Sequence, residues 1–169
     1  MAIKLGREFF IRDVLDVAPD LPGKYLIIGT PAVKRDFMIT EAEAYRGETD
    51  MACHASRGRT ARTSVMYERG GLLYIYLVYG IHWMLNIVTG EEGNPQAVLI
   101  RGIEGVSGPG RLTKSLQIDR SWNGIDITCS HLIKVEDRGA VPEISTSPRI
   151  GIDYAGEPWI SKPWRYFIP

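Results

Sequence analysis

The chain has 169 residues with 20 acidic and 20 basic side chains, so its formal net charge is zero. This length fits one domain, here taken as residues 1–169, and is too short for two ordinary ones. Zero net charge provides no long-range attraction to a polyanion, which counts against a generic nucleic-acid binder. Arginines nevertheless gather between 57 and 69, directly after an acidic segment between 41 and 50. The sequence therefore leaves open both a basic face beside an acidic pocket and plain solvated surface.

Cysteine usage and hydropathy indicate the compartment. Cys53 and Cys129 form neither a Cys-x-x-Cys pair nor a secreted disulfide framework. The first residues contain no apolar signal core, and no apolar run is long enough to cross a bilayer. We expect a soluble cytoplasmic protein with no membrane partner, associated with the nucleoid if the source is prokaryotic.

The N-terminal part predicts one helix and two strands. Apolar spacing favours a short helix over 9–17, which Pro19 and Pro22 would end. Alternation then predicts strands over 24–29 and 36–43. Because strand side chains alternate between faces, Glu41 and Glu43 should share one face.

Residues 49–69 are rich in Ala, Ser, Gly and Arg and show no sustained period. We expect a short helix around His54 followed by a long loop that carries arginines. Long ordered loops are often functional.

The segment 72–88 consists of two apolar runs that meet at Tyr79-Gly80, which predicts a β-hairpin with a tyrosine at its tip. A tyrosine at a turn buries little of its ring, so folding alone gains little from it. A partner outside the protein is a better explanation, because apolar or aromatic wedges on protruding elements part stacked bases of DNA. Tyr74 and Tyr76 share one strand face, whereas Tyr79 has the opposite parity.

Beyond the hairpin, residues 97–102 predict a buried strand that carries Arg101, and 108–116 predict the start of a helix. The free amides of that helix could face a phosphate, or the segment could be an ordinary junction. Residues 125–167 read as further strands or loops. The expected fold class is a single α+β domain: a curved, mostly antiparallel sheet with a protruding hairpin and flanking short helices.

Glu43 and Tyr45 should lie on one strand face, with His54 following after a turn-rich interval. A carboxylate, aromatic rings and an imidazole could hold a planar heterocycle by stacking and activate a water beside it. Each residue also has a structural explanation: a solvated glutamate, a satisfied histidine, core tyrosines. A metal held by the acidic residues and His54 lacks a compact ligand pattern, so we expect no metal.

A set of residues spread along the chain is similar to a known family. It comprises Glu43-Ala44-Tyr45, His54, Arg57-Gly58-Arg59-Thr60, Leu73 to Gly80, Asn86, Arg101 and Gly108-Pro109-Gly110-Arg111-Leu112. The set resembles the alkyladenine (3-methyladenine or methylpurine) DNA glycosylase family of mammals and many bacteria. The similarity extends from about Phe9 to the terminal segment 163–167. Pro19 and Pro22 interrupt a region where relatives read as a longer helix.

The resemblance implies a monofunctional enzyme of base excision repair that acts on double-stranded DNA without a cofactor. A wedge hairpin has to be unobstructed, so we expect a monomer. Tyr79 would intercalate into the gap left by the flipped nucleotide, while Tyr45, His54 and Tyr76 would sandwich its base. Glu43 would activate the attacking water, placed by Arg101 and the main-chain carbonyl of Ile150. Asn86 would lie against the purine edge. Further DNA contacts would come from Met66, His82, Arg57, Arg59, Gly110 and Arg111.

The implied substrates are 3-methyladenine and 7-methylguanine, with hypoxanthine and ethenoadenine as further candidates. Damaged bases cost less to unstack than intact pairs. Zero net charge predicts weak non-specific DNA binding with a shallow salt dependence. Two alternatives stay open: a non-catalytic module that binds damaged DNA or structured RNA, and a metal-dependent phosphodiesterase that a chelator would inhibit.

Overall fold

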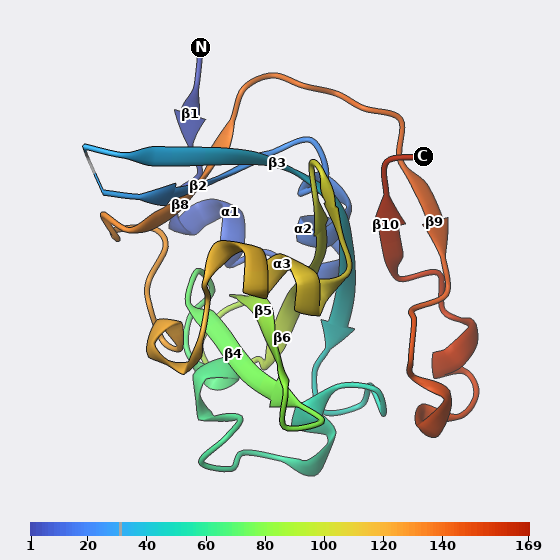
Figure 1. Cartoon of the computed structure of the whole chain (residues 1–169). Helices are drawn as coiled ribbons and strands as arrows, with labels where there is room; N and C mark the ends of the chain where they lie inside the picture. Colours follow the sequence, from blue (N-terminus) through green and yellow to red (C-terminus); the bar gives the residue numbers. More distant parts are fainter. Residues whose placement is uncertain (31) are drawn as a thin grey trace.

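A computed structural model describes residues 1–30 and 32–169 (Figure 1). The strands are β1 (Ile3–Lys4), β2 (Tyr25–Gly29), β3 (Lys34–Arg46), β4 (Leu73–Val78), β5 (His82–Thr89), β6 (Gln96–Ile103), β7 (Val106–Ser107), β8 (Ile133–Asp137), β9 (Ser145–Ser147) and β10 (Arg165–Phe167). The α-helices are α1 (Arg7–Phe10), α2 (Val14–Asp20) and α3 (Pro109–Leu116). Short 3-10 helices are η1 (His54–Arg57), η2 (Ser64–Tyr67), η3 (Arg120–Trp122), η4 (Asp153–Ala155) and η5 (Trp159–Ser161).

One antiparallel sheet contains all the described strands. Its main path runs β1-β8-β2-β3-β6-β5-β4, with β10 beside β3, β9 beside β10 and β7 beside β6. In Figure 1 the β4–β5 hairpin extends away from β1, and β9 and β10 lie side by side. The predicted α+β class and mostly antiparallel sheet are confirmed.

Strand β3 connects the two parts of the sheet. Its first half pairs with β2, and its second half lies between β6 and β10. Its register against β6 shifts on both sides of Glu41. Opposite this irregularity, a Cβ on Gly102 would lie 2.8 Å from Thr40 Oγ1, so only glycine allows the two strands to approach so closely.

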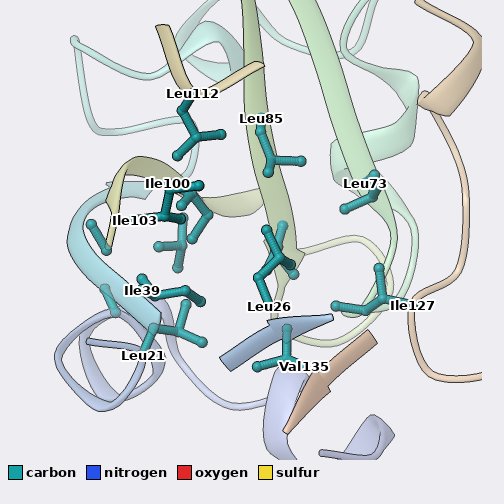
Figure 2. Packing of buried hydrophobic residues seen from close by; sticks show 14 of the residues in the cluster. Leu21, Leu26, Ile39, Leu73, Leu85, Ile100, Ile103, Leu112, Ile127 and Val135 are labelled. Carbon is teal, nitrogen blue, oxygen red and sulfur yellow. The ribbon is translucent and has the colours of Figure 1, made fainter. Parts of the chain in front are cut away.

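The main core lies between the sheet and its helices (Figure 2). Strand residues Leu26, Ile39, Leu85 and Ile100 are almost fully buried, and Leu112 of α3 packs against the same cluster. Full burial of a leucine or isoleucine contributes about 1.5–3 kcal/mol, so this cluster supplies the rigid support on which the site is built. Among the described residues, no helix is long and apolar enough to cross a membrane.

The predicted single helix over 9–17 is wrong, because the segment forms two helices, α1 and α2. Asp13 begins α2 as its N-cap, where its Oδ1 accepts a hydrogen bond of 2.9 Å from the Leu15 N–H. Pro19 does not end α2 but lies inside it, next to the final residue Asp20. A proline there removes one hydrogen bond, which would have reached Leu15, and the short helix tolerates this loss.

The other predicted elements are confirmed, with shifted boundaries. The strands over 24–29 and 36–43 correspond to β2 and β3, and 97–102 corresponds to β6. The short helix around His54 is the 3-10 helix η1, whereas η2 in the following loop was not predicted. The helix beginning near 108 is α3, with Pro109 in its first turn.

The hairpin is confirmed, with Tyr79 and Gly80 at its tip. Val78 pairs with His82, and the Ile81 N–H donates to the Val78 carbonyl at 3.1 Å. Tyr79 and Gly80 both have positive φ, 53° and 67°. This turn suits the twist of the two strands, but it is an unusual conformation for a tyrosine. Tyr79 therefore occupies the tip at some conformational cost.

Candidate active site

Glu43 lies on β3 with no exposed surface, and donors surround its carboxylate. The Tyr45 hydroxyl donates to Oε1 at 3.1 Å, and the backbone N–H of Ile150 donates to Oε2 at 2.6 Å. Arg101 Nη1 lies 3.6 Å from Oε1. The carboxylate is therefore fixed through both oxygens.

The pKa of Glu43 is raised, and burial is the largest cause. The charge of Arg101 and the hydrogen bonds from Ile150 and Tyr45 oppose this rise, while the charge of Glu41 adds to it. Burial disfavours the charged carboxylate, whereas donors and cations favour it. A carboxylate of raised pKa is a stronger base when ionised, as a water-activating group requires.

Arg101, on β6, is shared unequally between two glutamates. Its Nε donates to Glu41 Oε1 at 2.9 Å, closer than its approach to Glu43. Arg165, on β10, donates to the same oxygen of Glu41 at 2.6 Å. Glu41 therefore lies between two guanidinium groups. The sequence predicted that it shares a face with Glu43 but gave no signal of this ion-pair network.

Aromatic rings gather around the other residues of the site. The His54 and Tyr76 ring centroids are 4.4 Å apart, and those of Tyr74 and Tyr76 are 5.3 Å apart. His54 Nδ1 and the Tyr74 hydroxyl form a hydrogen bond of 2.9 Å. The structure thus brings η1 and β4 together, as predicted for His54 and Tyr76. Tyr74, which fixes the imidazole, was not among the predicted site residues.

Burial, together with the positive charges of Arg62 and Arg57, lowers the pKa of His54 to about 4. The imidazole is therefore neutral at neutral pH. Arg62 also lies over the Tyr76 ring, with its guanidinium carbon 5.3 Å from the ring centroid. The aromatic wall thus has an uncharged histidine on one side and an exposed arginine above it.

Asn86 lies on β5, buried beneath the aromatic strand. Its side-chain N–H donates to the Tyr74 carbonyl at 3.1 Å, and its backbone pairs with Tyr74 and Leu99. Only 3% of the residue is exposed. The amide is therefore held rigidly by β4.

The tip of the hairpin contrasts with this buried group. Tyr79 is 90% exposed, and the neighbouring apolar residues Leu77 and Ile81 are exposed as well. Such a cluster is expected at a surface that meets a partner.

Most of the residues predicted to contact DNA lie at the surface, and one is buried. The exposed residues are Arg57, Arg59, His82 and Arg111. Gly110 packs against His82, since a Cβ on Gly110 would lie 2.9 Å from His82 Nδ1. Gly110 and His82 both line a surface cavity of about 430 Å³ between β5 and α3.

Met66 is different, because its side chain is 2% exposed and packs in a second core cluster with Cys53, Tyr67 and Tyr74. A side chain this deeply buried cannot touch DNA, which contradicts the predicted DNA contact for the side chain of Met66. The sequence pattern did not separate it from the exposed arginines around it, since the loop has no regular period.

The acidic segment is not plain solvated surface, because Glu41, Glu43 and Asp50 are all buried. Within residues 1–30 and 32–169, no group of three histidine, cysteine or acidic side chains is arranged to hold a metal ion. Asp50 is instead paired with Arg149, a residue that the sequence gave no reason to select.

A fixed buried carboxylate beside aromatic rings, next to an exposed aromatic tip, is the arrangement expected of a hydrolase that acts on a planar base displaced from duplex DNA. Comparison with known proteins gives the particular family. The model of the methylpurine-DNA glycosylase family matches residues 8–108 and 104–169. The chain belongs to this family.

Relatives from several organisms cover almost the whole chain. A protein of Methanocella arvoryzae described as "Putative 3-methyladenine DNA glycosylase" is 45% identical, covering 96% of this chain and 91% of the relative. Proteins with the same description from Desulfitobacterium hafniense and Psychrobacter cryohalolentis are 41% and 45% identical. They cover 98% and 93% of this chain, and 95% and 87% of their own lengths.

Family membership confirms the predicted family and enzyme class. The chain is a DNA glycosylase, a hydrolase of N-glycosidic bonds in the base excision repair of alkylated DNA. Damaged DNA is the substrate that this membership implies.

Proposed function

We propose that the protein flips alkylated purines, with 3-methyladenine and 7-methylguanine as the main substrates, out of duplex DNA and hydrolyses their N-glycosidic bond with a water activated by Glu43. The observation that carries this proposal is the burial of Glu43 among three donor groups, two of them hydrogen bonded to its carboxylate. A monomer binding one lesion is the simplest assembly for this reaction.

In the reaction, Glu43 accepts a proton from the water as the water oxygen bonds to the sugar C1′. The bond between C1′ and the base nitrogen breaks, and its electron pair leaves with the base. Positive charge develops on the sugar, as in glycoside hydrolysis, and the ionised carboxylate stabilises it. Arg101 and the main-chain carbonyl of Ile150 place the water. The fixed N–H of Ile150 supports this role because it already holds that segment against Glu43.

The base binds between Tyr45, His54 and Tyr76, with Asn86 beside its edge. Alkylated bases such as 3-methyladenine are cationic, and aromatic rings attract desolvated cations by about 1 kcal/mol or more. A protonated histidine in the wall would repel them. The low pKa of His54, about 4, therefore favours cationic lesions at neutral pH. Hypoxanthine and ethenoadenine are neutral and need protonation to leave, so we place them as slower substrates.

Tyr79 fills the gap that the flipped nucleotide leaves, and exposed basic residues hold the strand. Arg57, Arg59, His82 and Arg111 are the proposed phosphate contacts, with backbone amides near Gly110. An aromatic wedge makes flipping less costly because it replaces part of the lost stacking.

The test is a panel of duplexes carrying 3-methyladenine, 7-methylguanine, hypoxanthine or ethenoadenine, scored for free base and abasic sites in single-turnover conditions. We expect fast release of the methylated bases by the wild type and release about 10³-fold slower by Glu43→Gln. Binding of these duplexes without base release at saturating protein would instead favour a non-catalytic damage-binding module. Strand cleavage abolished by a chelator would favour the phosphodiesterase. Either result contradicts the proposal.

A further inference from the structure

Arg149 and Asp50 form a charged pair with no exposed side-chain surface on either partner. Arg149 Nη1 donates to Asp50 Oδ2 at 2.6 Å, and Nη2 donates to Oδ1 at 3.0 Å. Asp50 also accepts the backbone N–H groups of Arg46 and Ala52. The pair therefore joins the C-terminal segment after β9 to the loop after β3, across 99 residues of sequence.

Three contacts connect this pair to the catalytic glutamate. Arg149 Nη1 also donates to the carbonyl of Ala44 at 2.9 Å, and Ala44 lies between Glu43 and Tyr45 on β3. The guanidinium carbon lies 4.9 Å from the centroid of the Tyr45 ring. The next residue, Ile150, donates its N–H to Glu43. One guanidinium thus touches β3, supports the ring of Tyr45 and fixes the segment that holds the carboxylate.

A stability role alone explains this arrangement poorly. Removing two charges from water is costly, and apolar replacements of buried pairs are often neutral or stabilising. Arg149 Nε is in addition buried without a hydrogen-bond partner among the described residues. A buried arginine that is imperfectly satisfied, yet connected to the site through three contacts, is better explained by the geometry that it imposes.

We propose that Arg149, held by Asp50, is a positioning residue for Glu43: it fixes the Ile150 N–H on the carboxylate and the Tyr45 ring behind it. The inference rests on the proposed role of Glu43 as the base. Arg149 itself does not touch the water or the nucleotide.

The experiment compares Arg149→Lys with the wild type on 3-methyladenine duplex, measuring single-turnover release from pH 4.5 to 8. Lysine keeps the charge opposite Asp50 but cannot reach Asp50 and Ala44 in the same planar geometry. The Ile150 hydrogen bond lowers the pKa of Glu43. When it loosens, that pKa rises, so the acid limb of the pH profile should move to higher pH. The rate should fall roughly 10- to 100-fold, the loss of one hydrogen bond to a charged group.

Arg7→Lys is the matched control, because Arg7 pairs with Asp126 and the Gly70 carbonyl and contacts no residue of the site. It should keep the wild-type rate and acid limb. A double variant, Arg149→Met with Asp50→Asn, removes both charges together and so leaves no unpaired ion. It should show the same shift of the acid limb as Arg149→Lys, whatever its thermal stability.

The inference is overturned if both Arg149 variants fold and keep the wild-type acid limb and rate. A fall in melting temperature with an unchanged pH profile has the same meaning, since a purely structural role predicts that pattern. If the wild type releases no base, the proposed function fails instead, and the two failures are distinguishable.

Discussion

Strand β4 has a tyrosine near each end, and the protein treats the two in opposite ways. Tyr74 is 2% exposed, hydrogen bonded to His54 and packed in a core cluster. Tyr79, just beyond the other end, is 90% exposed and adopts a positive φ. The end of β4 at Tyr74, here called the pocket end, is therefore fixed by contacts within the protein. The other end, the tip at Tyr79, has its ring exposed and can gain contacts only from a partner. Substitutions should therefore separate chemistry at one end from duplex opening at the other.

The largest effect is expected at the pocket end, from Glu43→Gln. Loss of a general base typically costs 10²- to 10⁴-fold in rate, so single-turnover release of 3-methyladenine should fall by about 10³-fold. Affinity for lesion-containing duplex, measured by fluorescence anisotropy, should stay near the wild-type value, because Tyr79 and the basic residues are untouched. Activity close to wild type would remove Glu43 as the base.

The next effect is expected at the tip, from Tyr79→Ala. Because the ring is exposed, the free energy of unfolding should change by no more than roughly 0.5 kcal/mol, as for other surface substitutions. Excision from a fully paired duplex should fall about 10-fold, because unstacking costs a few kcal/mol and only part of it is offset by the wedge.

The same variant tested on a lesion in single-stranded DNA provides the control, since no stack has to be opened there. We expect a much smaller loss than on duplex. Equal losses on both substrates would mean that Tyr79 acts on the bound base and not on the duplex.

The hairpin tip and the pocket also differ in how far the sequence alone predicts their structure. Strand parity and the Tyr79-Gly80 step are local signals, and they gave the hairpin, its tip and the shared face of Glu43 and Tyr45 correctly. The break between α1 and α2 was missed although its cause is local, because an Asp13 cap competes with an uninterrupted apolar pattern.

The groups that hold the pocket were not predictable in this way. Arg149 meets Asp50 across 99 residues, and Arg165 meets Glu41 across 124. Such pairs depend on β10 docking beside β3, and no periodicity in either segment signals it. The chemistry of the side chains therefore identified the groups proposed to meet the substrate, whereas nothing in the sequence signalled the ion pairs around them.

A smaller effect is expected from Glu41→Gln, which tests how the pocket sets the basicity of Glu43. The charge of Glu41 raises the pKa of Glu43, and its carboxylate holds Arg101 away from Glu43. Without that charge, Arg101 can approach Glu43 and lower its pKa. The acid limb of the pH profile should therefore move to lower pH, opposite to the shift expected for Arg149→Lys.

The neutral-pH rate of Glu41→Gln should fall by several-fold, since a weaker base activates water less well. Glu136→Gln is the control, because Glu136 is also ion paired, with Lys134 and Arg138, but lies on β8. A limb that does not move, in a variant that folds, would show that Glu41 does not influence Glu43.

The smallest effect is expected from Tyr74→Phe, at the buried end of the comparison. The change keeps the ring but removes the hydroxyl that is hydrogen bonded to His54 Nδ1. We expect a net loss of about 0.5–1.5 kcal/mol of binding free energy for the flipped base. This corresponds to roughly a 2- to 10-fold weaker hold on the flipped base. Tyr67→Phe removes a similar bond, to Glu48, outside the pocket wall, and should leave excision unchanged. If both variants reduce excision equally, the orientation of His54 does not matter to the base. The part of the pocket that must be fixed before DNA binds would then be limited to the groups around Glu43.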